Sequence, residues 1–231
     1  MDRINPRRYS SCNNLPFPNI SKPQVIGAFS VNQNREVLSG KRSLINLKYL
    51  KIPNPPRNLS YDLNRGDDTY VYKPESAQND KLSHLLKFIQ NNPHLIINGR
   101  LNSDFVCFRG LLRLIMCTPY ENQEGWIIQA TKFNGTIYLC AEETAKKKAD
   151  RLNKTDNDLK FCRYGFKFES FILSNSFNRN PTPNEPVLEG EEFCTMFGCK
   201  LNGKRLLYGA EVDGIDSHKE CQDLEQYFLN L

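Results

Sequence analysis

Two carboxylates near the end of the chain stand where the pattern predicts a buried strand. Residues 209–214 are G-A-E-V-D-G, and they follow the apolar Leu206 and Leu207. Side chains in a strand alternate between its faces, so Glu211 and Asp213 would point the same way, roughly 6–7 Å apart. At an effective dielectric constant near 20, their repulsion costs about 2–3 kcal/mol. An exposed face would screen much of this repulsion, whereas a buried face would require a cation.

Glu169 is a third acid in an unexpected position. Cys162, Phe166, Glu169 and either Ile172 or Leu173 form one stripe of a helix predicted over residues 158–173. Glu169 therefore lies on the apolar stripe rather than on the polar face. Carboxylates in apolar surroundings are costly unless a cation accompanies them.

Two interpretations of the three acids are open. Clustered carboxylate oxygens suit Mg²⁺ or Mn²⁺, which can activate water and stabilise charge on a phosphoryl group. Alternatively, Glu169 pairs with a nearby lysine or arginine, while Glu211 and Asp213 face solvent at a strand end.

Arg109 is another unexpected charge, because it follows a short apolar strand in F-V-C-F-R-G, residues 105–110. A guanidinium group suits bidentate contact with a phosphate or carboxylate, and Gly110 would let backbone N–H groups approach an anion. A structural role as partner of a buried acid is the alternative. The chain has no Walker loop, G-x-G-x-x-G, H-E-x-x-H or G-x-S-x-G motif, and its three scattered histidines give little support to a histidine-activated nucleophile.

The composition is that of a globular protein with a mild positive charge. The 231 residues are 39% hydrophobic and 25% charged, with a net charge of +5 that permits an anionic partner such as RNA without requiring one. The eight cysteines form no C-x-x-C pair, which argues against a zinc site and suits reduced thiols. No apolar run approaches 18 residues, so we expect no signal peptide, no membrane helix and no membrane partner.

The elements that must position these residues follow from periodicity and turn residues. Residues 1–78, rich in Pro, Asn and Arg, predict an extended arm with a few short strands. Leu82, Leu85, Leu86 and Ile89 predict an amphipathic helix that Pro93 ends.

Beyond this helix, the sequence alternates between strands and helices. Residues 105–108 predict a strand, and residues 111–117 a buried helix or strand. Asn134-Gly135 and Asn202-Gly203 predict two hairpins, the second with a slightly longer loop, and residues 174–186 a loop. The order of elements indicates a mixed α/β (α+β) fold, with antiparallel hairpins flanked by helices.

Five motifs in order resemble the eukaryotic decapping nuclease family, the DXO-type decapping and exoribonuclease proteins. They are F-V-C-F-R-G at 105–110, T-P-Y-E-N-Q-E-G-W at 118–126, F-N-G-T-I-Y-L at 133–139, Y-G-F-K-F-E at 164–169 and A-E-V-D-G at 210–214. The resemblance covers nearly the whole chain from about Pro16. It implies an arm over residues 1–20 and one PD-(D/E)xK nuclease-like domain over residues 21–231.

The resemblance also implies a function. Such proteins are hydrolases that remove incomplete or non-canonical 5′ caps, including NAD caps, from RNA and then degrade the RNA 5′ to 3′. It implies RNA quality control in the nucleus, with the cytoplasm as an alternative, and a 5′–3′ exoribonuclease as a candidate protein partner.

Roles for individual residues follow from the same resemblance. Catalytic and metal-binding roles with Mg²⁺ or Mn²⁺ fall on Glu169, Glu211 and Asp213. The implied substrate-binding positions are Arg35, Asp80, Phe108, Arg109, Gly110, Cys194 and Glu211.

One motif departs from the family pattern. Family members present E-L-K, whose Glu and Leu carbonyl bind metal and whose Lys meets the phosphate; here the corresponding metal positions are Asn230 and Leu231, and no lysine follows. Asparagine can lend a neutral oxygen to a metal but no negative charge. The family domain normally continues beyond this point, so we expect its C-terminal part to be missing. The alternative hypothesis is a relative that has lost catalytic activity and binds or scaffolds RNA 5′ ends.

Overall fold

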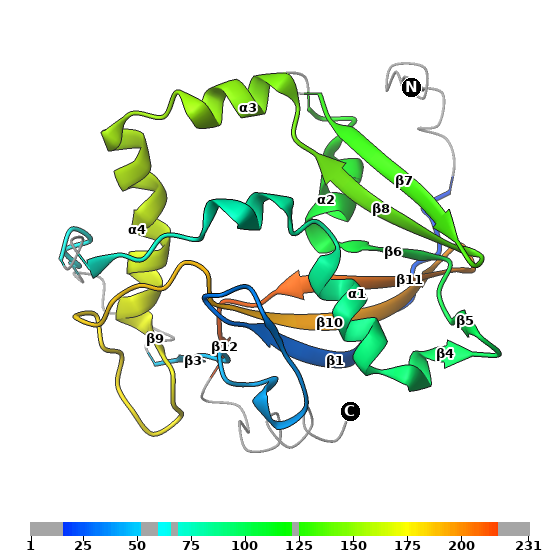
Figure 1. Cartoon of the computed structure of the whole chain (residues 1–231), viewed down its shortest axis with the longest axis horizontal. Helices are drawn as coiled ribbons and strands as arrows, with labels where there is room; N and C mark the ends of the chain where they lie inside the picture. The colour runs from blue at the N-terminus through cyan, green and yellow to red at the C-terminus, as the bar shows by residue number, and fades with distance from the viewer. Residues whose placement is uncertain (1–15, 52–59, 66–68, 122–124, 217–231) are drawn as a thin grey trace. The chain divides into compact units, whose positions relative to one another are not determined.

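The computed structural model describes residues 16–51, 60–65, 69–121 and 125–216. Asn230 and Leu231 therefore lie outside the described residues. Figure 1 shows the elements in chain order. They are β1 (Gln24–Val31), β2 (Val37–Leu38), η2 (Gly40–Arg42), β3 (Tyr49–Leu50), η4 (Glu75–Asn79), α1 (Ser83–Asn91), η5 (Pro93–Leu95), β4 (Ile96–Ile97), β5 (Arg100–Leu101), β6 (Phe105–Phe108), α2 (Arg109–Cys117), β7 (Ile127–Phe133), β8 (Thr136–Glu142), α3 (Ala145–Leu152), α4 (Asp156–Ile172), β9 (Leu173–Ser174), β10 (Glu192–Leu201), β11 (Lys204–Glu211) and β12 (Ile215–Asp216).

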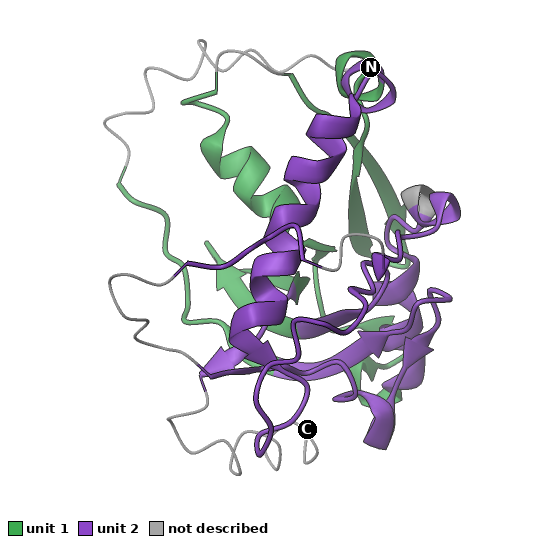
Figure 2. Ribbon diagram, turned by 90° about the vertical axis from the view of Figure 1, so that its left-hand side faces the viewer, with its two compact units in different colours: residues 1–25, 93–148, 196–210 green, residues 26–92, 149–195, 211–231 purple. Residues whose placement is uncertain are grey.

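The chain forms two compact units, which Figure 2 colours separately. Unit 1 comprises residues 1–25, 93–148 and 196–210, and unit 2 comprises residues 26–92, 149–195 and 211–231. The expectation of a single domain from residue 21 onward stays a prediction.

Unit 1 is built on a mixed sheet in which hydrogen-bonded neighbours follow the order β10-β11-β6-β8-β7. Strand β6 pairs in parallel with both β11 and β8, which explains why its sequence F-V-C-F has no polar alternation. Both predicted hairpin turns are confirmed: Asn134, Gly135, Asn202 and Gly203 all have positive φ, as a type I′ turn requires. The second loop has two residues and is not longer than the first, because β10 ends at Leu201 and β11 begins at Lys204.

The N-terminal part of unit 1 also meets its sheet. Ile20 forms an antiparallel bridge with Leu201, and the Asn19 N–H donates to the Asn202 side chain at 2.9 Å. The described end of the predicted arm thus lies along β10.

Two helices differ from their predictions. Residues 109–117 form helix α2, but Leu111 is its one buried residue, and Met116 is 72% exposed. The prediction of a buried segment was wrong because an apolar sequence does not by itself tell which side chains become covered. Helix α3 was not predicted, although Thr144 accepts a hydrogen bond from Lys147 N–H at 3.2 Å, a typical N-cap contact.

Unit 2 packs helix α1 against strand β1. The predicted helix is confirmed, and Leu85, Phe88 and Ile89 are buried on one of its faces. The ring centroids of Phe29 and Phe88 lie 5.7 Å apart. Gly27 permits this close approach, because a Cβ there would lie 2.8 Å from the Phe88 ring.

A small three-stranded sheet of order β12-β3-β9 forms the second part of unit 2. Tyr49 of β3 pairs with Ile215 in parallel and with Ser174 in the antiparallel sense. Leu47, Tyr49 and Phe193 form a core beside it. The sheet therefore brings together three distant parts of the sequence: β3, β9 directly after α4, and β12 shortly after β11.

Candidate metal centre

Helix α4 carries Glu169 in its last turns. The helix begins two residues earlier than predicted, after a capping box: Thr155 Oγ1 accepts from Asp158 N–H at 3.2 Å, and Asp158 Oδ2 accepts from Thr155 N–H at 2.9 Å. The T-x-x-D pattern was the available sequence signal. Near the other end, the Glu169 side chain is 26% exposed and thus half-buried, as predicted. The rest of the predicted stripe is only partly confirmed, because Cys162 is exposed and the buried residue of the helix is Lys167.

Strand β11 and the residues after it carry the other two acids. The strand ends at Glu211, but Val212 N–H still donates to Phe193 O at 2.9 Å, so the pairing continues for one more residue. Val212 packs against the core of Leu47, Tyr49 and Phe193. Its neighbours Glu211 and Asp213 are both exposed to solvent at a cavity that Glu169 also lines.

This cavity of about 460 Å³ brings together the three acids that the sequence singled out. Its remaining charged lining comes from Lys48, Glu185, Glu191 and Glu192. All of these residues belong to unit 2.

The surroundings of the cavity raise the pKa of Glu169 and of Glu211. Burial, followed by the charges of Asp213 and Glu211, raises the pKa of Glu169 from 4.5 to about 7, against the lowering effect of Lys48. Burial also raises the pKa of Glu211, with Glu192 and Asp213 adding to the effect. Glu211 is exposed at the cavity mouth, yet the surrounding protein is close enough to remove much of its hydration. A nearby cation would favour the ionised form of both groups.

The residues fit a divalent metal in chemistry, because carboxylate oxygens are the ligands that Mg²⁺ and Mn²⁺ prefer. Within residues 16–51, 60–65, 69–121 and 125–216, however, no three acidic, histidine or cysteine side chains are close enough to hold an ion together. The three acids thus face one cavity without forming a closed set of ligands.

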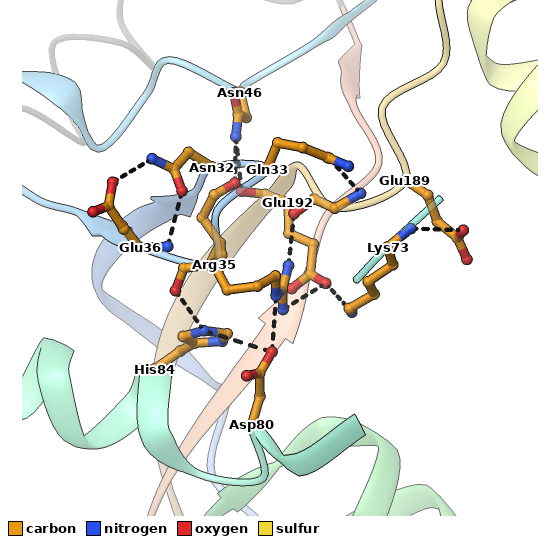
Figure 3. Close-up of polar contacts among 12 residues, drawn as sticks. Asn32, Gln33, Arg35, Glu36, Asn46, Lys73, Asp80, His84, Glu189 and Glu192 are labelled. Atoms are coloured by element: carbon orange, nitrogen blue, oxygen red, sulfur yellow. Dashed lines mark hydrogen bonds and ion pairs between the residues drawn. The ribbon is translucent and has the colours of Figure 1, made fainter. Parts of the chain in front are cut away.

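Arg35 lies at the centre of a network of polar contacts, and one member of that network, Glu192, also lines the cavity. Figure 3 shows these contacts. Its Nε donates to Asp80 Oδ2 at 2.8 Å, one terminal nitrogen donates to Gly190 O at 2.6 Å, and the other lies 3.1 Å from Glu192 Oε1. Lys73 Nζ also binds Glu192 Oε1. The Arg35 side chain is only 8% exposed, so most of its donors serve the protein itself.

The backbone at Arg35 and at Gly190 adds further hydrogen-bonding contacts to this network. Arg35 has a φ of +64°, and its carbonyl oxygen lies 3.2 Å from His84 Nε2. Burial, followed by the Arg35 charge, lowers the pKa of His84. Gly190 N–H donates to Gln33 Oε1 at 2.9 Å, and a Cβ on Gly190 would lie 2.4 Å from that oxygen.

The other predicted substrate residues lie in different surroundings. Cys194 is in unit 2 and is 4% exposed. Phe108, Arg109 and Gly110 lie in unit 1, where Arg109 is exposed at the start of α2. The structure thus places Glu169, Glu211 and Asp213 around one cavity, and the metal and substrate roles of all these residues stay predictions.

Sequence reasoning missed Lys48, Lys73 and Glu192. Glu192 is the first residue of β10, directly before buried Phe193, and an acid beside an apolar strand was the same signal that singled out Glu211. The two lysines gave no comparable signal, because neither interrupts a periodic apolar segment.

Comparison with known proteins identifies the family. The family model described as "RAI1 like PD-(D/E)XK nuclease" matches residues 21–231. The chain belongs to this family. Its mixed sheets with antiparallel hairpins and flanking helices confirm the predicted fold class.

Individual relatives match most of the chain. The "Decapping and exoribonuclease protein Rai1" of Drosophila melanogaster is 36% identical over 226 residues, which cover 92% of this chain and 59% of that protein. The chain therefore spans little more than half the length of this relative.

Solved structures show the same fold. The structure of Scheffersomyces stipitis Rai1 "in complex with (3'-NADP)+ and calcium ion" superposes on this chain with a TM-score of 0.67 at 19% sequence identity. The matched region covers 85% of this chain and 53% of the Scheffersomyces chain. The structure of Candida albicans Rai1 "in complex with pU5-Mn2+" gives a TM-score of 0.67 at 13% identity, and the matched region covers 86% of this chain and 55% of the Candida chain.

Among the described residues of this chain, no helix combines the length and apolar character needed to cross a bilayer.

Proposed function

We propose that this protein is a metal-dependent decapping nuclease that hydrolyses non-canonical or incomplete 5′ caps of RNA, including NAD caps, with 5′–3′ exoribonuclease activity as a second reaction. The observation behind the proposal is that Glu169, Glu211 and Asp213 line one cavity in a chain of the RAI1-like nuclease family. The names of relatives support it, since one is a decapping and exoribonuclease protein and others were solved with a 3′-NADP ligand and calcium, or with pU5 and Mn²⁺.

In this proposal, the three carboxylates hold Mg²⁺ or Mn²⁺. A metal bound there supplies positive charge to the developing phosphoryl oxyanion and lowers the pKa of a bound water. The protein's own contribution is to fix Glu169 through α4 and Glu211 through β11 on the same cavity. Burial is the first cause of the raised pKa of Glu169 and Glu211, and neighbouring acids add to it, so a bound cation would favour the ionised form of both.

The test is hydrolysis of NAD-capped and 5′-triphosphate RNA by the purified chain in Mn²⁺. We expect cleavage by the wild type, and loss of at least about 100-fold in rate in Glu211→Gln, because a metal supplies several kcal/mol of charge stabilisation. Glu75→Gln is the matched control, since Glu75 is exposed in η4 and does not line the cavity. Undiminished cleavage by Glu211→Gln would reject the assignment.

A second candidate is a catalytically impaired relative that binds or scaffolds RNA 5′ ends. Two observations favour it: Asn230 replaces an expected glutamate, and no three candidate ligands come together among the described residues. The same assay separates the candidates, because this protein would retain the RNA without turning it over.

We also propose that the protein acts in the nucleus with a 5′–3′ exoribonuclease as protein partner. The support is the family membership alone. Fractionation of cells, followed by pull-down of the tagged protein with a purified exoribonuclease, tests both parts.

A further inference from the structure

Lys48 is held at the cavity by backbone contacts from two directions. It directly precedes β3, and its carbonyl oxygen accepts from Ile215 N–H at 2.9 Å. The next residue, Tyr49, pairs with Ile215 on one side and with Ser174 on the other. The position of Lys48 is therefore tied both to the segment after Asp213 and to the segment after α4.

Gly214 permits a close approach of its own segment to Leu173 and to the backbone of Lys48. A Cβ at position 214 would lie 2.6 Å from Leu173 Cδ2 and 3.3 Å from Lys48 O. A larger residue there would force the Leu173 side chain to shift and would crowd the Lys48 carbonyl oxygen. The last residue of G-A-E-V-D-G thus brings Asp213 near Lys48 and near the end of the helix that carries Glu169.

The charges that line the cavity are unbalanced, even though one of its acids, Glu192, is paired with Arg35 and Lys73. Among its described lining residues, six are acids and one, Lys48, is a cation. A phosphate approaching the carboxylates meets their repulsion, and a bound divalent metal would offset only part of it. Lys48 is the lining residue with the charge to attract a phosphate.

The Lys48 ammonium group is available for such a contact. Its Nζ lies 3.9 Å from Glu169 Oε2, which is too long for a hydrogen bond, and the side chain is 35% exposed. The neighbouring cations differ, because Arg35 and Lys73 are both in direct contact with Glu192. An ammonium group has three donors, so Lys48 can accompany Glu169 and still bind a phosphate oxygen.

We propose that Lys48 is a phosphate-binding residue of this cavity, which holds a phosphate group of the RNA 5′ end against the carboxylates that bind metal. The proposal rests on the proposed function. It assigns the phosphate contact to a lysine that precedes the acids in the chain and lies directly before β3, outside all of the sequence motifs.

The experiment measures binding of pentauridylate, with and without a 5′-phosphate, to the full chain in Ca²⁺. Lys48→Met removes the charge at nearly constant length, Lys48→Arg retains it, and Lys51→Met is the matched control. Lys51 lies three residues away, outside the cavity lining, with its ammonium over the Phe177 ring. Thermal unfolding of each variant confirms that it folds.

We expect Lys48→Met to weaken binding about tenfold, Lys48→Arg to restore most of it, and Lys51→Met to change it less than twofold. Loss confined to the 5′-phosphorylated ligand assigns the terminal phosphate, and equal loss for both ligands assigns an internal one. Mn²⁺ affinity, measured by calorimetry, should stay within about threefold of the wild type.

Two outcomes overturn the proposal. Equal binding by Lys48→Met and Lys51→Met shows that Lys48 touches no phosphate, and tighter Mn²⁺ binding with unchanged RNA binding makes it only a counter-ion of Glu169. If the wild type cleaves RNA in either case, the proposed function stands without Lys48. If the wild type binds neither Mn²⁺ nor RNA, the proposed function itself is wrong, and the role of Lys48 with it.

Discussion

Two neighbouring groups of charged side chains in unit 2 differ in how their charge is compensated. Around Arg35, each acid has a basic partner: Asp80 Oδ2 lies 2.8 Å from Arg35 Nε, and Glu192 meets both Arg35 and Lys73. We call this group, formed by Arg35, Lys73, Asp80 and Glu192, the Arg35 network (Figure 3). Its cations and anions come from the protein itself.

The cavity acids are compensated less closely: burial and the neighbouring acids raise the pKa of Glu211, and they outweigh the charges of Lys73 and Arg35, which lower it. Among the described residues, Lys48 lies 3.9 Å from Glu169, and burial raises the pKa of this acid to about 7 despite that contact. A protein that neutralises one group so fully and leaves the adjacent one unbalanced has room for a cation in the second. The contrast is between charges that are paired within the protein and a cavity whose described lining carries more acids than cations.

The largest expected effect comes from breaking the Arg35 network. Arg35→Ala removes the main cation beside Asp80 and one of the two cations that contact Glu192, which should lower the free energy of unfolding by about 3–5 kcal/mol. Urea denaturation measures the change. Arg42→Ala, at an exposed position in η2, should cost less than about 0.5 kcal/mol. Similar losses in the two variants would mean that the network contributes little to stability.

A smaller effect is expected from Gly214→Ala. The added methyl group would overlap Leu173 and approach Lys48 O, so we expect a loss of about 1–3 kcal/mol and weaker Mn²⁺ binding as Asp213 shifts. Calorimetric titration with Mn²⁺ and urea denaturation report the two effects. In contrast, Gly165→Ala in α4 meets nothing within 4 Å and should stabilise the helix by up to about 1 kcal/mol. Normal Mn²⁺ affinity in Gly214→Ala would show that the three-stranded sheet does not position the acids.

The sequence predicted the parts of this comparison that depend on local pattern. Glu169 was found because it interrupts a helical stripe, and Glu211 and Asp213 because they follow an apolar strand. Each is a local contradiction between residue type and surroundings, which a single sequence displays. The hairpins were likewise predictable, since Asn-Gly favours the positive φ that both turns adopt.

The Arg35 network was not predictable in this way. Its contacts join residues 45, 119 and 155 positions apart, and nothing local tells which of many exposed-looking charges will meet. The resemblance singled out Arg35 and Asp80 as contacts of the RNA end, but it did not show that they bind each other. Lys48 escaped notice for the same reason, because the three-stranded sheet that places it is assembled from distant segments.

The smallest expected effect is a difference in pH dependence between the two groups in the metal-free protein. Glu169 has its pKa raised from 4.5 to about 7, so the folded state binds its proton more tightly than the unfolded state. Its contribution to stability therefore falls as the pH rises from about 4.5 to 7. His84, beside the Arg35 network, has its pKa lowered from 6.5, so its contribution falls as the pH drops below about 6.5.

Replacing each group should reduce the pH dependence of the free energy of unfolding in its own range, from about pH 4.5 to 7 for Glu169 and below about pH 6.5 for His84. Glu169→Gln should raise metal-free stability at pH 8 by about 1 kcal/mol and change little at pH 4.5, whereas His84→Gln should reduce the loss below pH 6.5. Urea denaturation at pH 4.5, 5.5, 7 and 8 measures both. Saturating Mn²⁺ should reverse the first effect, because the wild type then gains a cation that Glu169→Gln binds less well. If Glu169→Gln were less stable than the wild type at pH 8 without metal, the protein would already compensate this carboxylate, and the contrast between the two groups would not hold.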